Sequence, residues 1–254
     1  MKGTLVNVLA VLGGSAIGLL FGRLIPERVR KIAMAAIGLA VIAQGLQMAI
    51  DPRVDATKFA YHGALPYHPN MLVVIGGLVI GGIIGELLQI ELRLEHFGHW
   101  IKDRVERIPA LAPKGGDEPD AGGHNLVEGF VTASLLYCVG AMAVLGAISD
   151  GAGDPSILYV KSLLDGIASV VLASTMGIGV ALSVLPLFLY QGAISLASGF
   201  VAPYLTLPVI ATLTATGGLL IAAIGLDLAG IKRLPIGNLL PGVFVAAILA
   251  YFVG

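Results

Sequence analysis

Hydrophobic residues along the chain fall into long runs that are separated by short polar stretches. Eight runs approach the length of about 20 residues that a helix needs to cross a bilayer, and they cover residues 4–22, 32–50, 70–90, 126–148, 160–185, 187–206, 209–230 and 237–253. The sixth run is the least apolar and is bounded by Pro186 and Pro203, so it could re-enter the membrane without crossing it. The pattern predicts an all-α bundle of seven or eight transmembrane helices, folded as a single domain over residues 1–254.

Composition excludes a soluble globular protein. Hydrophobic residues make up 57% of the chain, charged residues make up only 12%, and the mean hydropathy is +0.92, whereas soluble domains carry about 25% charged residues. The basic residues are too few to form a surface for nucleic acid, so the expected partner is the lipid bilayer. Cys138 is the only cysteine, which excludes an intramolecular disulfide and a cysteine metal site.

Basic residues indicate the orientation in the membrane, because loops rich in Lys and Arg stay in the cytoplasm. The first and third connections between the runs carry most of them: Arg23, Arg28, Arg30, Lys31, Arg93, Lys102, Arg104, Arg107 and Lys114. We therefore expect a multi-pass protein of the cell (inner or plasma) membrane whose N-terminus lies outside.

The segment 91–124 is the only sizeable insertion between the runs. Apolar residues recur within it at helical spacing, opposite a charged face: Leu94, Phe97, Ile101, Val105 and Ile108. This spacing predicts a cytoplasmic amphipathic helix that lies at the membrane interface. The stretch PKGGDEPDAGG that follows predicts a flexible connection.

Glycine residues recur at every fourth position in the first and third runs, as Gly14, Gly18 and Gly22 and as Gly77, Gly81 and Gly85. Small residues at this spacing allow helix backbones to approach closely, so helix packing is the expected role of each glycine. The similarity of the two runs also predicts an internal repeat, and the glycine faces suggest a homodimer.

Polar residues open the fourth and fifth runs with the same spacing of i, i+3 and i+7, which lines one helix face. The two sets are Asn125, Glu128 and Thr132, and Ser162, Asp165 and Ser169. The first two residues of each set, Asn125 with Glu128 and Ser162 with Asp165, also resemble a capping box, in which a carboxylate binds the free amides of a helix start. Two interpretations stay open: capping alone, or capping combined with a polar pathway between two helices that start from opposite sides of the membrane, as in an inverted repeat.

The motif STMGIG, residues 174–179, lies in the middle of the fifth run. Gly177 and Gly179 weaken a helix, and broken helices near the membrane midplane hold ion sites in many transporters. Ser174 and Thr175 supply hydroxyl groups there, and Gln191 adds an amide in the sixth run. The hypothesis is an ion or substrate site that includes a Na⁺ at Asp165, Ser174 and Thr175; ordinary packing of small residues is an equal alternative.

The sequence contains no pattern that indicates an enzyme or a cofactor. All five histidines fall between the runs, and neither an HEXXH metal motif nor a GxSxG nucleophile motif is present. We therefore expect no catalytic residues and no cofactor.

Several strings resemble a known family of bacterial membrane proteins. They are GTLVNVLAVLGGSAIGLL, NLVEGFVTASLLYCVGAMAVLGAISDG, YVKSLLDGIASVVLASTMGIGVALS and GGLLIAAIGLDLAGIKRLPIGNLLP, and they are similar to the YqgA/YdfK-like proteins, a family of unknown function. The resemblance covers nearly the whole chain and implies a sodium channel or pump.

These observations favour a transporter or channel for a small ion, most simply a monovalent cation such as Na⁺ or H⁺. Carboxylate, hydroxyl and carbonyl oxygens are the ligands that hard cations prefer. Lys161, at the border of the fifth run, is the only basic residue close to a membrane interior, which argues against large anionic substrates. A transporter of small organic solutes and a non-transporting scaffold or sensor are the alternatives.

Overall fold

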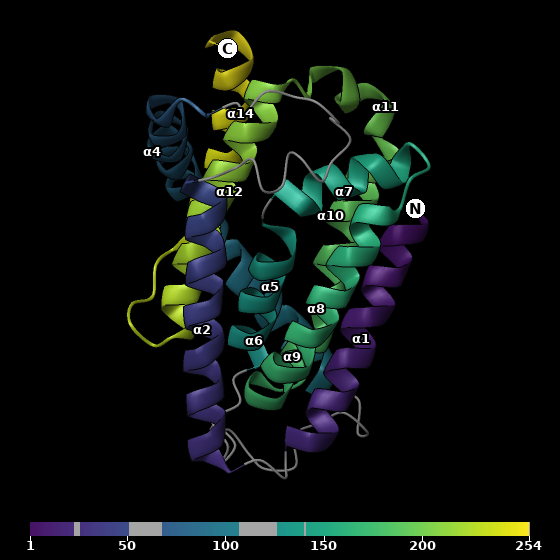
Figure 1. Ribbon diagram of the computed structural model, residues 1–254. Coiled ribbons are helices and arrows are strands. Elements are labelled where there is room, and N and C mark those ends of the chain that lie inside the picture. Colours follow the sequence, from purple (N-terminus) through teal and green to yellow (C-terminus); the bar gives the residue numbers. More distant parts are fainter. Residues whose placement is uncertain (23–25, 51–67, 107–125, 140, 254) are drawn as a thin grey trace.

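The computed structural model describes residues 1–22, 26–50, 68–106, 126–139 and 141–253, and every element in them is a helix (Figure 1). The long helices form one bundle. The elements are α1 (Lys2–Gly22), α2 (Glu27–Ile50), α4 (Met71–Leu87), α5 (Ile90–Glu106), α6 (Leu126–Cys138), α7 (Ala141–Gly151), α8 (Ser156–Met176), α9 (Gly179–Leu182), α10 (Val184–Leu196), α11 (Ser198–Val201), the 3₁₀ turn η1 (Ala202–Tyr204), α12 (Leu207–Leu228), α13 (Ile236–Leu239) and α14 (Pro241–Val253).

Five stretches in the described ranges are long and apolar enough to cross a membrane: α1, α8, α9 with α10, α12, and α13 with α14. Two bent pairs, α4 with α5 and α6 with α7, could each form one further span. The apolar part of α2, Met34–Ile50, is shorter. The helical membrane bundle expected from the sequence is confirmed, with five to seven helices that meet the length and composition of a span.

Glycine contacts fix how α1 lies on α8. Gly14 lies so close to α8 that a Cβ atom would overlap the carbonyl oxygen of Gly166, and Gly18 lies equally close to that of Val170. Contacts advance in the same direction along both helices, so α1 and α8 are parallel. The close approach leaves room for backbone contact and for small side chains only.

The other two major helix pairs are antiparallel. In α2 and α12, Gly38 lies against Ala229 and Gly45 against Ala222; in α4 and α14, Gly77 lies against Ala246 and Gly81 against Gly242. Eight successive crossings in alternating directions make the first and fifth runs parallel, and make the second antiparallel to the seventh and the third antiparallel to the eighth. The relative directions of the three helix pairs agree with that order. The most buried of the five candidate spans is α12, which packs against α2 and α14 and in which 89% of the residues of its apolar stretch are buried.

The boundaries of the fifth and sixth spans differ from the prediction. The expected run 160–185 is replaced by α8, which starts at Ser156 and ends at Met176. Gly177 follows in a left-handed conformation, with φ of +79°, which favours glycine and ends the helix. In Figure 1, α9 lies at the lower end of α8 and α10 returns beside it. The STMGIG motif therefore lies where two spans meet: its first three residues end α8, Gly177 and Ile178 form the turn, and Gly179 begins α9. The prediction that it breaks a helix at mid-membrane depth is wrong.

The chain bends sharply within two helix pairs, α6 with α7 and α4 with α5. The expected fourth run, 126–148, consists of α6 and α7, which are bent by 63° relative to each other, and α5 is bent by 51° from α4. The helix α5 coincides with part of the predicted amphipathic segment. Its Phe97 ring meets the Phe130 ring of α6 edge-on, 5.8 Å between centroids, so this part of its apolar face contacts protein. The stretch PKGGDEPDAGG lies outside the described residues.

Candidate functional site

The centre of α8 carries a buried ion pair. The ammonium of Lys161 pairs with the carboxylate of Asp165, one helical turn further along, and the two side chains are only 7% and 12% exposed. At about 1.5 Å per residue, Asp165 lies about 13 Å from the first residue of α8 and about 16 Å from the last. The pair is therefore close to the middle of a helix that is long enough to span the membrane.

The helices α1 and α10 add two amide side chains to this site: Asn7 of α1 contacts the carboxylate, and Gln191 of α10 contacts Asn7. Asn7 Nδ2 of α1 donates hydrogen bonds to Asp165 Oδ2, at 3.0 Å, and to Gln191 Oε1 of α10, at 3.3 Å. Asn7 and Gln191 are both fully buried. An unpaired buried charge is strongly destabilising, so these contacts explain how α8 accommodates a carboxylate at its centre.

Tyr137 of α6 extends this polar cluster along α8. Its hydroxyl lies 2.7 Å from Ser169 Oγ, and Ser169 Oγ donates a hydrogen bond of 2.6 Å to the carbonyl oxygen of Asp165. Because the single hydroxyl proton of Ser169 is used in that bond, Tyr137 is the donor to Ser169. The ammonium of Lys161 also lies 5.9 Å from the centre of the Tyr137 ring, a distance typical of a cation–π contact. We call Asn7, Tyr137, Lys161, Asp165, Ser169 and Gln191 the polar cluster.

Two atoms of the polar cluster have no hydrogen-bond partner among the described residues. They are Asn7 Oδ1, an acceptor, and Gln191 Nε2, a donor. Most buried polar side-chain atoms in proteins have a partner. The arrangement therefore leaves one acceptor and one donor available for a small polar ligand next to Asp165.

Comparison with known proteins identifies the family. Residues 2–251 match the model of DUF554, described as a protein of unknown function. The chain belongs to the DUF554 family. It is 32% identical to "Uncharacterized membrane protein YdfK" of Bacillus subtilis (strain 168) over 254 residues, which cover 100% of this chain and 97% of the relative. It is 29% identical to "Uncharacterized protein YqgA" of Escherichia coli (strain K12) over 245 residues, or 96% and 94% of the two chains. No solved structure matches.

The family membership confirms the resemblance seen in the sequence, and the name of the Bacillus relative supports a membrane protein. Neither relative's name states an activity. In this DUF554 chain, the chemistry of the site therefore has to be inferred from the side chains themselves.

Asp165 does not cap a helix, contrary to both interpretations of the pair Ser162 and Asp165. The helix α8 begins at Ser156, so both residues lie inside it, and Ser162 Oγ donates to the carbonyl oxygen of Leu158 at 2.5 Å. The acid at the start of α8 is Asp154, whose Oδ1 accepts from the amide of Ser156 at 3.0 Å. The prediction was wrong because it placed the helix start about one turn too late.

Ser174 and Thr175 lie at the opposite end of α8 from its start. Both hydroxyls donate to the carbonyl oxygen of Val171, at 2.7 and 3.0 Å. Nine residues of helix separate Ser174 from Asp165, which is about 13 Å along the axis. One ion cannot contact both, so the predicted Na⁺ site at Asp165, Ser174 and Thr175 is not formed.

The first predicted polar stripe also lies away from the polar cluster. A Cβ atom on Gly129 would lie 2.9 Å from the carbonyl oxygen of Met176, the last residue of α8. The start of α6, with Glu128, is therefore at the STMGIG end of the bundle, and the buried Thr132 follows one turn further in. Asn125 lies outside the described residues. The two stripes do start from opposite ends, but only Asp165, Ser169 and Gln191 of the predicted residues meet.

Two members of the polar cluster, Lys161 and Asn7, were not predicted as site residues from the sequence. Lys161 counted as a border residue, and Asn7 was only one of several intramembrane polar groups. The signal for Lys161 was its spacing of four residues from Asp165, which places the two on one helix face. The signal for Asn7 was its place as the one amide in the apolar run 4–22.

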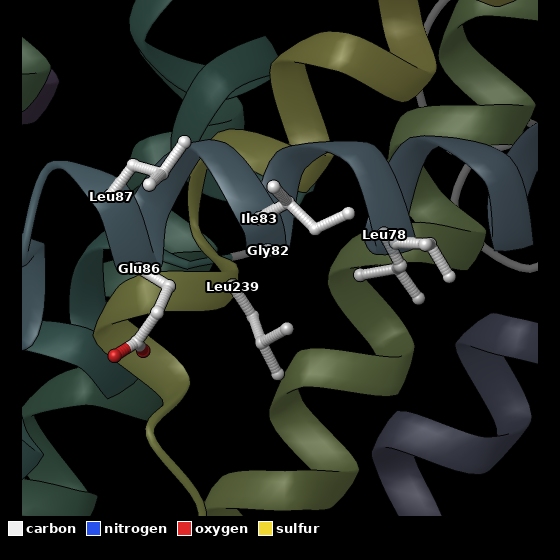
Figure 2. Close-up of a pocket in the computed structure, with 7 residues that line it drawn as sticks. Leu78, Gly82, Ile83, Glu86, Leu87 and Leu239 are labelled. Atoms are coloured by element: carbon white, nitrogen blue, oxygen red, sulfur yellow. The ribbon is translucent and has the colours of Figure 1, made fainter.

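No metal cluster accompanies the polar cluster in the described ranges, and the groove described next lies elsewhere. There, no group of three or more His, Cys, Asp or Glu side chains could hold a metal ion. A groove of about 470 Å³ runs along α4 (Figure 2) and is lined by Leu78, Val79, Gly82, Ile83, Glu86, Leu87 and Leu239. Glu86 Oε2 accepts a 2.7 Å hydrogen bond from Asn238, and the other lining residues are apolar or glycine. The groove therefore suits an apolar neighbour, and its helices contribute nothing to the polar cluster.

Proposed function

We propose that this DUF554 protein transports a small monovalent cation, Na⁺ or H⁺, across the membrane and that the cation binds at Asp165. The observation that carries the proposal is the ion pair of Lys161 with Asp165 at the middle of α8, with neither side chain more than 12% exposed. Charged side chains inside a membrane are rare and typically mark ion pathways.

The pairing gives a physical route for exchange. A monovalent cation carries the same charge as the Lys161 ammonium, so it can replace that ammonium at Asp165 without changing the net charge beside the carboxylate. Lysine has a long, flexible side chain whose charged end can move while its backbone stays in place. Transport then requires Lys161 and the cation to alternate at Asp165.

The remaining ligands fit a hard cation. The carboxylate of Asp165 and the unpartnered Oδ1 of Asn7 belong to side chains that are already in hydrogen-bond contact, since Asn7 Nδ2 lies 3.0 Å from Asp165 Oδ2. Carboxylate and amide oxygens are preferred by hard cations. The hydroxyl of Ser169 is fully used by Asp165 and Tyr137, so we now assign it to positioning of the helices and not to the cation.

The two alternative functions make different demands on the polar cluster. A carrier of small organic solutes would use the Asn7 acceptor and the Gln191 donor and would tolerate loss of the Asp165 charge. A scaffold or sensor would need the ion pair only for stability, so a neutral pair of similar size would serve as well. Neither alternative requires that a cation compete with Lys161.

The test is uptake of radiolabelled Na⁺ into proteoliposomes, with and without a pH gradient. The variant is Asp165→Asn, and the control is Asp227→Asn, a half-buried carboxylate at the end of α12 and outside the polar cluster. We expect the native chain and the control to take up Na⁺, or to move protons along the gradient, and the Asp165 variant to match empty liposomes. Equal activity of all three proteins, or none above empty liposomes in the native chain, would reject the proposal.

A further inference from the structure

All buried side-chain atoms that lack a hydrogen-bond partner in the described part of the chain lie on two helices. They are Asn7 Oδ1 and Ser15 Oγ on α1, and Gln191 Nε2 and Ser195 Oγ on α10. Asn7, Ser15 and Gln191 are fully buried, and Ser195 is 3% exposed. Buried polar atoms without a protein partner are usually satisfied by water. Their restriction to α1 and α10 indicates a common cause.

These four atoms follow one another along the bundle. Ser195 lies one turn beyond Gln191 on α10, and Ser15 lies two turns, about 12 Å, beyond Asn7 on α1. The amides of Asn7 and Gln191 touch at 3.3 Å. Because α8 is parallel to α1 and α10 returns beside α8 (Figure 1), Ser195 lies towards the start of α1 and Ser15 lies towards its end, with the amides and Asp165 between them.

The packing of α1 limits where this row of four unpartnered polar atoms can run. On the side of α8, Gly14 is in backbone contact with Gly166, which leaves no space for a solute. Ser15, the next residue, is fully buried on a different part of the helix surface. The fully buried Val11 separates Ser15 from Asn7 on α1, and an apolar side chain at such a point forms a constriction that water crosses only when it widens.

We infer that α1 and α10 line a narrow water-filled path that leads past Asp165, with its constriction at Val11. The ligand class is water or a small monovalent cation that has shed most of its hydration shell, because the polar groups of the row are uncharged hydroxyls and amides and Val11 narrows it. This deepens the proposed function, since it gives the cation a route, and it replaces the route between α6 and α8 that the sequence suggested.

The path is tested with Ag⁺, a small monovalent cation that reacts with thiols. In a Cys138→Ala background, Ser15→Cys and Ser195→Cys are compared in lipid nanodiscs with two controls: Ala215→Cys, fully buried in α12, and Leu163→Cys, 65% exposed on the outer surface of α8. Thiols left free by Ag⁺ are counted with a fluorescent maleimide after denaturation. Because thiol reactivity needs the thiolate and access, we expect both serine positions to react at least about tenfold faster than both controls.

Reaction no faster than that of Ala215→Cys would overturn the inference. A second measurement serves if a cysteine variant does not fold: Ser15→Ala and Ser195→Ala are compared with the native chain in thermal unfolding. Loss of a dry, unpartnered hydroxyl raises the midpoint, whereas loss of a hydrated one leaves it unchanged or lower. A raised midpoint in both variants would also overturn the inference. Fast Ag⁺ reaction in a protein that takes up neither Na⁺ nor H⁺ would keep the path and reject only the proposed function.

Discussion

Asn7 Nδ2 donates a hydrogen bond of 3.0 Å to Asp165 Oδ2, and so joins two helices through residues that are 158 positions apart in the sequence. The same amide group reaches Gln191 at 3.3 Å. One side chain therefore connects the carboxylate of α8 to both neighbouring helices, α1 and α10. Its contacts are made inside the bundle, where the low local dielectric strengthens a hydrogen bond.

Replacing Asn7 with leucine, which has a similar volume, should remove both hydrogen bonds and leave the Asp165 carboxylate with one partner fewer. We expect the free energy of unfolding to fall by about 1–3 kcal/mol and cation uptake to fall with it. The measurement is thermal unfolding in detergent together with uptake in proteoliposomes. The control is Val6→Ala on the same helix, at a side chain that is 39% exposed; an Asn7→Leu variant as stable as this control would show that the amide contributes nothing.

The charges of Lys161 and Asp165 allow stability and transport to be separated. Asp165→Asn alone should cost about 3–5 kcal/mol, because it leaves the Lys161 ammonium buried without its partner. The double variant Lys161→Met with Asp165→Asn removes both charges at similar volume, so its stability should return close to that of the native chain. We expect this double variant to fold and yet take up no cation, as measured by thermal unfolding and by uptake.

A double variant that folds and still transports would contradict the assignment of Asp165 as the cation ligand. A double variant as unstable as Asp165→Asn would instead show that the ion pair does not account for the loss. The two readouts therefore test two different statements about one pair of residues.

The sequence predicted the helical membrane bundle and the relative directions of the major helix pairs, because long apolar runs have few other structures in a bilayer. It did not place Asp165 correctly. From Ile157 to Phe200 the chain has only two charged residues, Lys161 and Asp165, and both lie near the start of this stretch, so hydropathy alone could not locate the end of α8. The conformation of Gly177 sets that end, and a glycine in an apolar run is equally compatible with a helix interior.

The polar cluster was only partly predictable for a related reason. Helical spacing identified Asp165 and Ser169 as one face of one helix, since that information is local. The partners Asn7 and Gln191 come from α1 and α10, and their meeting depends on which helices become neighbours. A single sequence does not contain that information directly, whereas the tertiary structure does.

The close approach of α1 and α8 should make Gly14 intolerant of any side chain. A Cβ atom at this position would overlap the carbonyl oxygen of Gly166, while a Cβ atom on Gly13 would meet no atom within 4 Å. We expect Gly14→Ala to lower the free energy of unfolding by about 1–3 kcal/mol through overpacking. Gly13→Ala should be neutral or slightly stabilising, because alanine favours a helix. Equal unfolding midpoints for the two variants would mean that α1 and α8 are further apart than described.

Asp150, at the end of α7, fixes the first turn of α1. Its carboxylate accepts hydrogen bonds from the amide of Gly3 at 2.9 Å and from the amide and hydroxyl of Thr4 at 3.1 and 3.0 Å, and the residue is only 3% exposed. Asp150→Asn replaces one accepting oxygen with a donor, so we expect a loss of about 1.5–3 kcal/mol per lost bond. Asp154→Asn, at a neighbouring acid, is the control.

Because Asp150 lies outside the polar cluster, its loss should act on stability alone. Uptake per folded protein at a temperature below both unfolding midpoints should equal that of the native chain, while the midpoint itself falls. A selective loss of uptake without a fall in the midpoint would place Asp150 on the cation path. That result would move the end of the path near the start of α1 from α10 to the junction of α1 and α7.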